Sequence, residues 1–170
     1  MNRLRLPLTV AQALSADSST GAPVVTVSGW IRSTRAHRST AFVQLTDGSS
    51  QRDLQIVLQP ELRPLLPRLS VGTSIRVSGA LVVPPSASSS PTKTTTTIGA
   101  ASKESVELLS SSLEILGDCL PTEYPLAKTR LSLDYLRSLP HLRSRSRTFQ
   151  SLWRVRSAAI SGIHAFFAVC

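Results

Sequence analysis

The chain has 170 residues, of which 41% are apolar, so it is long enough for one domain with a buried core and is not disordered throughout. Lys and Arg number 19 against 10 Asp and Glu; the resulting formal net charge of +9 is typical of proteins that bind a polyanion, with an ordinary basic surface as the alternative. No run of about 18 apolar residues occurs, which excludes a transmembrane helix and argues against a membrane as partner.

Residues 1–23 form an N-terminal segment that carries Arg3 and Arg5 before its first acid, Asp17. An acid-poor, Arg-bearing start is typical of organellar transit peptides, although this one is short and interrupted by Pro7. We expect a short first helix in this segment and a location in the mitochondrial matrix, with the cytoplasm as the alternative.

Three β-strands are predicted within residues 24–58. The run 24–31 alternates between two sets of side chains, and the runs 41–46 and 53–58 do the same. The turn residues 47–50 separate the last two runs, which predicts a hairpin with a longer loop.

A proline-punctuated segment at 60–69 precedes a fourth predicted strand at 74–83. Residues 84–105 contain 11 Ser or Thr and three prolines, as low-complexity insertions do, and a fifth strand is predicted at about 105–116. Five short strands with a small irregular piece after the third predict an OB-fold β-barrel over residues 24–117. A fragment of a β-sandwich gives a similar pattern, so the pattern alone leaves both open.

The second half of the chain is predicted to be helical. A linker over 118–147 contains a short helix at 132–139, and residues 148–170 form a longer helix for which Thr148 is the predicted N-cap. Residues 120–170 hold eight Lys or Arg and two acids, so most of the net charge lies here. The apolar residues of one stripe of the long helix are Phe149, Leu152, Trp153, Ile160, Ile163 and Phe167. Because this face needs a partner and the chain ends within the helix, we expect a truncated chain.

Alternation also assigns two side chains to the outer face of the barrel. The apolar set at 41, 43 and 45 faces the core, which places Phe42 outside, and the same argument for 53–58 places Gln55 outside. A ring can stack on an unpaired base and an amide can bond a base edge. Nearby arginines that can hold phosphate are Arg32, Arg35 and Arg38. These residues predict a nucleic-acid site; packing of Phe42 under the first helix or a loop is the alternative.

A second basic run lies in the predicted linker. Its members are His141, Arg143, Arg145 and Arg147. Such a run is usually a solvated connection, and contact with a phosphate backbone is its alternative role.

No complete set of catalytic or metal-binding residues is found in the sequence. The three histidines are far apart and lack carboxylate or cysteine neighbours at metal-ligand spacing, and Cys119 and Cys170 form no cluster. There is no Gly-rich phosphate loop and no nucleophile elbow, and Asp47-Gly48 is better explained as a turn than as an acid. We therefore predict neither catalytic residues nor a metal site.

Two separated segments resemble a known family. Residues 25–58 resemble the anticodon-binding OB domain of class II aminoacyl-tRNA synthetases of the aspartyl, asparaginyl and lysyl group. The matching residues are Gly29-Trp30-Ile31-Arg32, Arg35, Phe42, Asp47-Gly48-Ser49-Ser50 and Leu54-Gln55. The turn at 47–50 and a second segment, residues 124–149, resemble asparaginyl-tRNA synthetase specifically. Its matching residues are Tyr124-Pro125-Leu126, Lys128, Arg130, Leu136-Arg137, His141-Leu142-Arg143 and Arg147-Thr148-Phe149.

This resemblance implies roles for three residues. Phe42 is similar to the aromatic residue that stacks on an anticodon base, Gln55 to the residue that reads the central uridine, and Arg35 to its partner arginine. Arg32, Arg38, Arg143, Arg145 and Arg147 remain possible phosphate contacts. Helix 148–170 resembles the opening helix of motif 1 in an α+β catalytic domain, through which enzymes of this class form homodimers.

The implied function is asparagine–tRNA ligase, which uses ATP and Mg2+ and has tRNA(Asn) as its partner. Motifs 2 and 3, and with them the ATP and amino-acid sites, are not found in these residues, so we expect the chain alone to be inactive as an enzyme. Two alternatives stay open: a stand-alone OB-fold module that binds tRNA, and a structural or single-stranded-DNA-binding OB protein.

Overall fold

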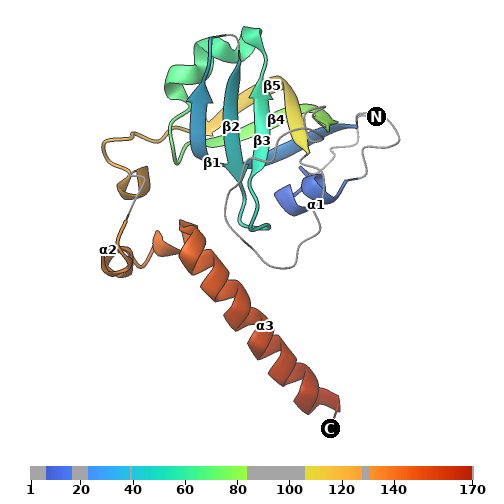
Figure 1. Ribbon diagram of the computed structural model, residues 1–170, viewed down its shortest axis with the longest axis vertical. Helices are drawn as coiled ribbons and strands as arrows, with labels where there is room; N and C mark the ends of the chain where they lie inside the picture. The colour runs from blue at the N-terminus through green and yellow to red at the C-terminus, as the bar shows by residue number, and fades with distance from the viewer. Residues whose placement is uncertain (1–6, 17–22, 39, 84–105, 128–130, 170) are drawn as a thin grey trace, which may run out of the picture. The chain divides into compact units, whose positions relative to one another are not determined.

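The computed structural model describes residues 7–16, 23–38, 40–83, 106–127 and 131–169. The chain divides into two compact units, residues 1–123 and 124–170. In the first unit five strands form a closed barrel (Figure 1): β1 (Val24–Ala36), β2 (Ala41–Thr46), β3 (Leu54–Leu58), β4 (Ser74–Val82) and β5 (Glu107–Gly117). The predicted five-stranded OB barrel is confirmed, and the predicted insertion at 84–105 lies outside the described residues.

The strands form because every second side chain enters one shared core. Ala41, Val43 and Leu45 of β2 have no exposed surface, and neither do Leu54 and Ile56 of β3. Burying one such Leu or Ile side chain stabilises the fold by about 1.5–3 kcal/mol. The period-2 pattern therefore sets the inward and outward faces of both strands.

Strand β1 is long enough to pair on two sides. Its first half, Val24 to Trp30, pairs antiparallel with β4, and its second half pairs antiparallel with β2. Gly29 lies where the two halves meet, and a Cβ there would stand 2.6 Å from the carbonyl oxygen of Thr46. A side chain would separate the strands at this point, so the barrel needs glycine.

The barrel closes through β5, which pairs parallel with β3 and antiparallel with β4. Closure leaves no free sheet edge in the strand order β1-β2-β3-β5-β4. It also brings residues from the two sides of the 84–105 insertion next to each other, such as Gln55 and Glu107.

A short helix, α1 (Val10–Ser15), contributes Val10 and Ala13 to the barrel core. It begins with a capping box in which Thr9 and Gln12 exchange side-chain-to-backbone bonds. This confirms a short helix before the barrel. Residues 1–6 lie outside the described residues.

The turn between β2 and β3 completes the cap of α1. The Asp47 carboxylate accepts the Val10 N–H at 2.8 Å, and the Ser49 hydroxyl accepts the Ala11 N–H at 2.9 Å. Gly48 has φ of +83°, a conformation that glycine adopts without strain. Asp47 thus lies in the predicted turn, and it also caps α1, which the sequence pattern did not indicate.

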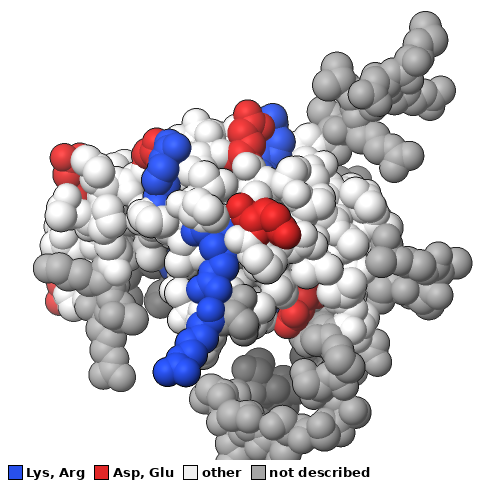
Figure 2. All heavy atoms as spheres, turned by 90° about the horizontal axis from the view of Figure 1, so that it is seen from above, with Lys and Arg blue, Asp and Glu red and all other residues white. Residues whose placement is uncertain are grey.

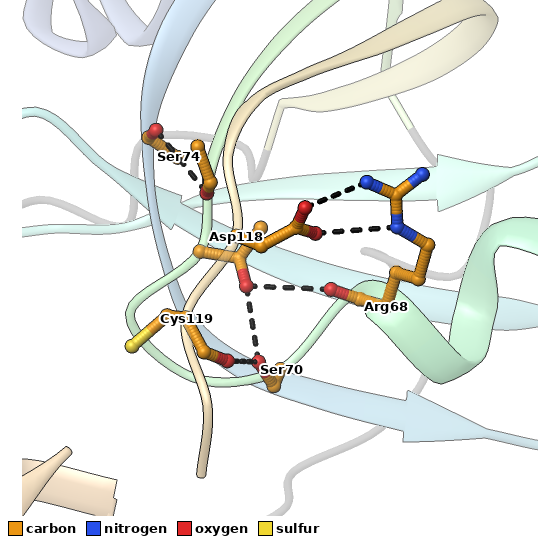
Figure 3. A network of polar contacts seen from close by, with 7 residues as sticks. Arg68, Ser70, Ser74, Asp118 and Cys119 are labelled. Atoms are coloured by element: carbon orange, nitrogen blue, oxygen red, sulfur yellow. Dashed lines mark hydrogen bonds and ion pairs between the residues drawn. The ribbon is translucent and has the colours of Figure 1, made fainter. Parts of the chain in front are cut away.

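The segment after β5 is tied to η1 (Pro60–Arg68), a 3-10 helix that follows β3. Arg68 makes two bonds to the Asp118 carboxylate, at 2.7 Å from Nη2 and 3.2 Å from Nε. The Ser70 hydroxyl donates to the Cys119 carbonyl beside this ion pair (Figure 3). The first residues of the predicted linker therefore pack on the barrel.

The second unit consists of η3 (Pro125–Ala127), α2 (Leu133–Ser138), η4 (Arg143–Arg145) and α3 (Arg147–Val169). The two predicted helices are confirmed, but the N-cap assigned to Thr148 is wrong. Helix α3 begins at Arg147, because the Ser146 hydroxyl accepts the Phe149 N–H at 3.4 Å and its carbonyl accepts the Gln150 N–H at 2.9 Å. Ser146, two residues before Thr148, caps the helix as well as threonine would.

Among the described residues, no helix is both long enough and apolar enough to cross a membrane. The longest, α3, has an apolar stripe and also carries Arg147, Arg154 and Arg156.

Candidate nucleic-acid interface

The outer face of β1, β2 and β3 collects the predicted base-contacting residues. Arg35 lies directly opposite Phe42 in the β1–β2 pair, and Gln44 lies directly opposite Gln55 in the β2–β3 pair. Phe42 and Gln44 are two residues apart on β2, so all four side chains share one side of the sheet. The predicted outward orientation of Phe42 and Gln55 is confirmed, since both are half-buried while their strand neighbours are fully buried.

Phe42 is half-buried and packs against a loop, as the structural alternative stated above also predicts. Its ring contacts the imidazole of His37 from the β1–β2 loop, with centroids 6.1 Å apart and planes at 78°. Arg35, its cross-strand partner, is exposed. Phe42 thus combines an aromatic surface with a neighbouring cation, the pair that holds a stacked base and its phosphate.

Gln55 has a partner that sequence reasoning missed. Its Nε2 donates to Glu107 Oε1 at 2.8 Å, from the first residue of β5. Burial raises the pKa of the Glu107 carboxyl above its usual range, and the Gln55 hydrogen bond opposes this by favouring the carboxylate. The bond orients the Gln55 amide and leaves its Oε1 as an acceptor and the second N–H of Nε2 as a donor for a base.

The side-chain amide of Gln44, which neighbours Gln55 on this outer face, bonds another residue of the barrel. Gln44 Oε1 accepts the Ser33 hydroxyl at 2.8 Å. Gln44 and Gln55 therefore present different groups, although they are cross-strand partners.

The three arginines of the first strand and its loop have different surroundings. Arg32 Nε lies 3.2 Å from Asp53 Oδ1, and the Asp53 side chain is only 4% exposed. This ion pair commits Arg32 to fixing the start of β3. Arg35 and Arg38 are exposed and remain the better placed for phosphate.

A fourth arginine, Arg63 of η1, lies at the same loop and was not singled out in the sequence. It donates to the carbonyls of His37 and Arg38, at 2.9 Å and 2.7 Å. No local pattern reveals it, because these partners are 25 and 26 residues away along the chain.

The other predicted phosphate contacts belong to the second unit. Arg143 and Arg145 lie in η4 and Arg147 begins α3. The Arg143 guanidinium stands 5.6 Å from the Phe149 ring and 5.9 Å from the Trp153 ring, close enough for cation–π contact. The structure thus brings Arg35, Phe42 and Gln55 together and places these three arginines on a separate unit.

The face of the molecule seen in Figure 2 carries basic and acidic side chains side by side rather than a single basic patch. In the part of the chain that the structure describes, no group of three or more His, Cys, Asp or Glu gathers as a metal site would require. Burial, and secondarily the charge of Glu123, raises the pKa of the Cys119 thiol, which disfavours the reactive thiolate. The described geometry is suited to binding through rings, amides and guanidinium groups.

A family model described as "OB-fold nucleic acid binding domain" matches residues 25–116, more than half of the chain. The chain belongs to this family. The matched region runs from the first residues of β1 to the last residues of β5, so it includes Arg35, Phe42, Gln55 and Glu107.

Curated relatives confirm the resemblance to asparaginyl-tRNA synthetase. The chain is 37% identical to asparagine–tRNA ligase of Microcystis aeruginosa over 146 residues, 84% of this chain and 29% of that protein. It is 36% identical to asparaginyl-tRNA synthetase of Mus musculus over 166 residues, 97% of this chain and 31% of that protein. The chain therefore spans less than a third of the length of these relatives.

Solved structures show the same fold. Asparaginyl-tRNA synthetase from Pyrococcus horikoshii, complexed with asparaginyl-adenylate, matches 96% of this chain and 34% of its own with a TM-score of 0.72 at 14% identity. Asparaginyl-tRNA synthetase from Entamoeba histolytica matches 96% of this chain and 36% of its own with a TM-score of 0.70 at 18% identity.

Proposed function

We propose that the chain is the anticodon-recognising part of an asparagine–tRNA ligase, which charges tRNA(Asn) with asparagine. The observation that carries this is the shared outer face of Arg35, Phe42 and Gln55 on three paired strands. The names of the relatives support the substrate, and the family supports binding of a nucleic acid.

In this proposal Phe42 stacks on an anticodon base and Arg35 holds the adjacent phosphate or base. Gln55 reads the central uridine. The bond to Glu107 orients this amide, and in this proposal its Oε1 accepts the N3–H of uracil. Cytosine has no proton at N3, and its donor on this edge is the N4 amino group at a different position, so an acceptor placed against N3 favours uracil.

The ligase reaction needs ATP and Mg2+, and the residues that the structure describes do not provide a matching donor set. No step of adenylate formation is therefore assigned to them. The function proposed for these residues is binding and selection of the tRNA.

The test is binding of RNA hairpins that carry GUU or GCU in the loop, the former complementary to an asparagine codon. We expect the chain to prefer GUU and the variant Gln55→Ala to lose that preference. Gln44→Ala is the matched control, because its amide is bonded to Ser33 on the same face. Equal binding of both hairpins by the unaltered chain would contradict the proposal, and tighter binding of single-stranded DNA in competition would favour a general OB protein.

We also propose that the full-length protein is a homodimer that pairs through α3. Support comes from the exposed apolar side chains along this helix, including Ile163 at 58% and Phe167 at 71% exposure. A continuous, exposed apolar surface of this kind is typical of a protein–protein interface.

A location in the mitochondrial matrix remains a proposal. It is supported by Arg3 and Arg5 ahead of the first acid. Imaging of the chain fused at its C-terminus to a fluorescent protein tests it, with Arg3→Ala/Arg5→Ala as the comparison. Diffuse fluorescence of the unaltered fusion would favour the cytoplasm.

A further inference from the structure

The loop beside Phe42 is held by a residue from another element. Arg63 donates from Nη2 to the His37 carbonyl at 2.9 Å and from Nη1 to the Arg38 carbonyl at 2.7 Å. The donors of a guanidinium group form a rigid planar fork, so two bonds to successive carbonyls restrict both the position and the orientation of the loop. The His37 N–H in turn donates to the Thr40 carbonyl at 2.8 Å, so both backbone polar groups of His37 are held.

This fixed backbone presents the His37 ring to Phe42. The two planes meet at 78° with centroids 6.1 Å apart, a geometry that aromatic pairs favour. A base stacked parallel to Phe42 is therefore nearly perpendicular to the His37 ring, which offers nitrogen atoms for hydrogen bonds. His37 itself is exposed and thus accessible to a ligand.

We infer that Arg63 is a positioning residue of the base site, and that it holds His37 as a second ring against the base stacked on Phe42. The inference rests on the proposed function and deepens it, since it adds a residue that touches RNA and one that acts through the loop. Arg68 lies on the same 3-10 helix but bonds Asp118 instead, so it is a natural control for the loss of a cation from η1.

The test uses the whole 170-residue chain and two RNA hairpins, one with GUU in its loop and one in which all three nucleotides of that triplet are abasic. Affinities are measured by fluorescence anisotropy for Arg63→Ala, His37→Ala, the double variant, His37→Phe and Arg68→Ala. Urea unfolding midpoints of all variants are recorded alongside.

We expect Arg63→Ala and His37→Ala each to weaken binding of the intact hairpin by roughly 3- to 10-fold, the effect of losing one aromatic contact. The double variant should bind no more weakly than the weaker single variant, because both changes remove the same contact. Affinity for the abasic hairpin should not change. His37→Phe should keep most of the affinity, and Arg68→Ala should leave both affinities as they are.

Equal losses on the intact and abasic hairpins would overturn the inference, because they would indicate a phosphate contact rather than a positioned ring. Additive losses in the double variant, or unchanged binding by His37→Ala, would overturn it as well. If Arg63→Ala fails to fold, Arg63→Lys replaces it, because lysine keeps the cation but lacks the planar fork that bonds both carbonyls, and it should show the same loss on the intact hairpin. An unaltered chain that binds both hairpins equally would instead contradict the proposed function itself.

Discussion

Phe42 and Leu45 lie on the same short strand in opposite surroundings. Leu45 is fully buried in the barrel, whereas Phe42 faces outward next to His37 and opposite Arg35. At the scale of single residues, the alternation of side chains along a strand therefore separates those that stabilise the fold from those available to a ligand.

This separation gives a first prediction. Phe42→Ala should weaken binding of the GUU hairpin by about 1–3 kcal/mol, because it removes a stacking surface. Its unfolding free energy should change little. Leu45→Ala is the contrast: it should cost about 2–5 kcal/mol of stability, because it leaves a cavity in the core. Urea unfolding and hairpin titration of both variants measure this, and a large loss of stability in Phe42→Ala would mean that the ring is structural.

Glu107 gives a second prediction, on pH. Burial raises its pKa in the folded protein, so folding favours the protonated carboxyl, and this contribution to stability is lost as pH rises through the raised value. Glu107→Gln removes the charge and keeps a partner for Gln55. We expect the variant to gain stability relative to the unaltered chain from about pH 4 to pH 7, with no difference at the acid end, where the carboxyl is protonated in both states. Urea midpoints across this range test it; a gap that is constant with pH would contradict it.

At the scale of elements, several pieces are too short to be stable alone and depend on residues outside themselves. Helix α1 has six residues, fewer than an isolated helix needs, and its N-terminus is completed by the β2–β3 turn. The segment after β5 is held in the same way by Arg68 and Ser70 (Figure 3).

We therefore predict that Asp47→Ala destabilises the protein by about 0.5–2 kcal/mol, as the loss of a helix cap does. Asp134→Ala is the matched control, because its side chain is 92% exposed and, among the residues that the structure describes, forms an ion pair with Arg137 one turn along the same helix. That change should stay within about 0.5 kcal/mol. Thermal unfolding of both variants is the measurement, and equal effects would show that the cap of α1 does not stabilise the barrel.

The apolar stripe of α3 predicts self-association. We expect the purified chain to sediment as more than a monomer, because Trp153, Ile160 and Ile163 are exposed on one side of a helix. Ile163→Glu should shift the population toward monomer. Ser161→Glu adds the same charge away from the stripe and should leave association as it was; a monodisperse monomer in the unaltered chain would contradict the prediction.

At the scale of the whole molecule, the described residues form a binding unit followed by a helical unit. The chain spans less than a third of the ligases it resembles. We expect the 170-residue polypeptide to bind the GUU hairpin and to catalyse no asparagine-dependent pyrophosphate exchange, because motifs 2 and 3 are not among its residues. Exchange well above a control without protein would contradict this.

Local pattern determined the strands, their inner and outer faces, the turn at 47–50 and the two outward residues Phe42 and Gln55, because period-2 alternation is written into consecutive residues. It did not determine the partners of those residues. Glu107 reaches Gln55 across 52 positions of sequence, and Arg63 reaches the β1–β2 loop across 25 and 26. These contacts exist only once β5 pairs with β3 and η1 follows β3 back toward that loop, and no local propensity encodes which distant segments a closing barrel brings together.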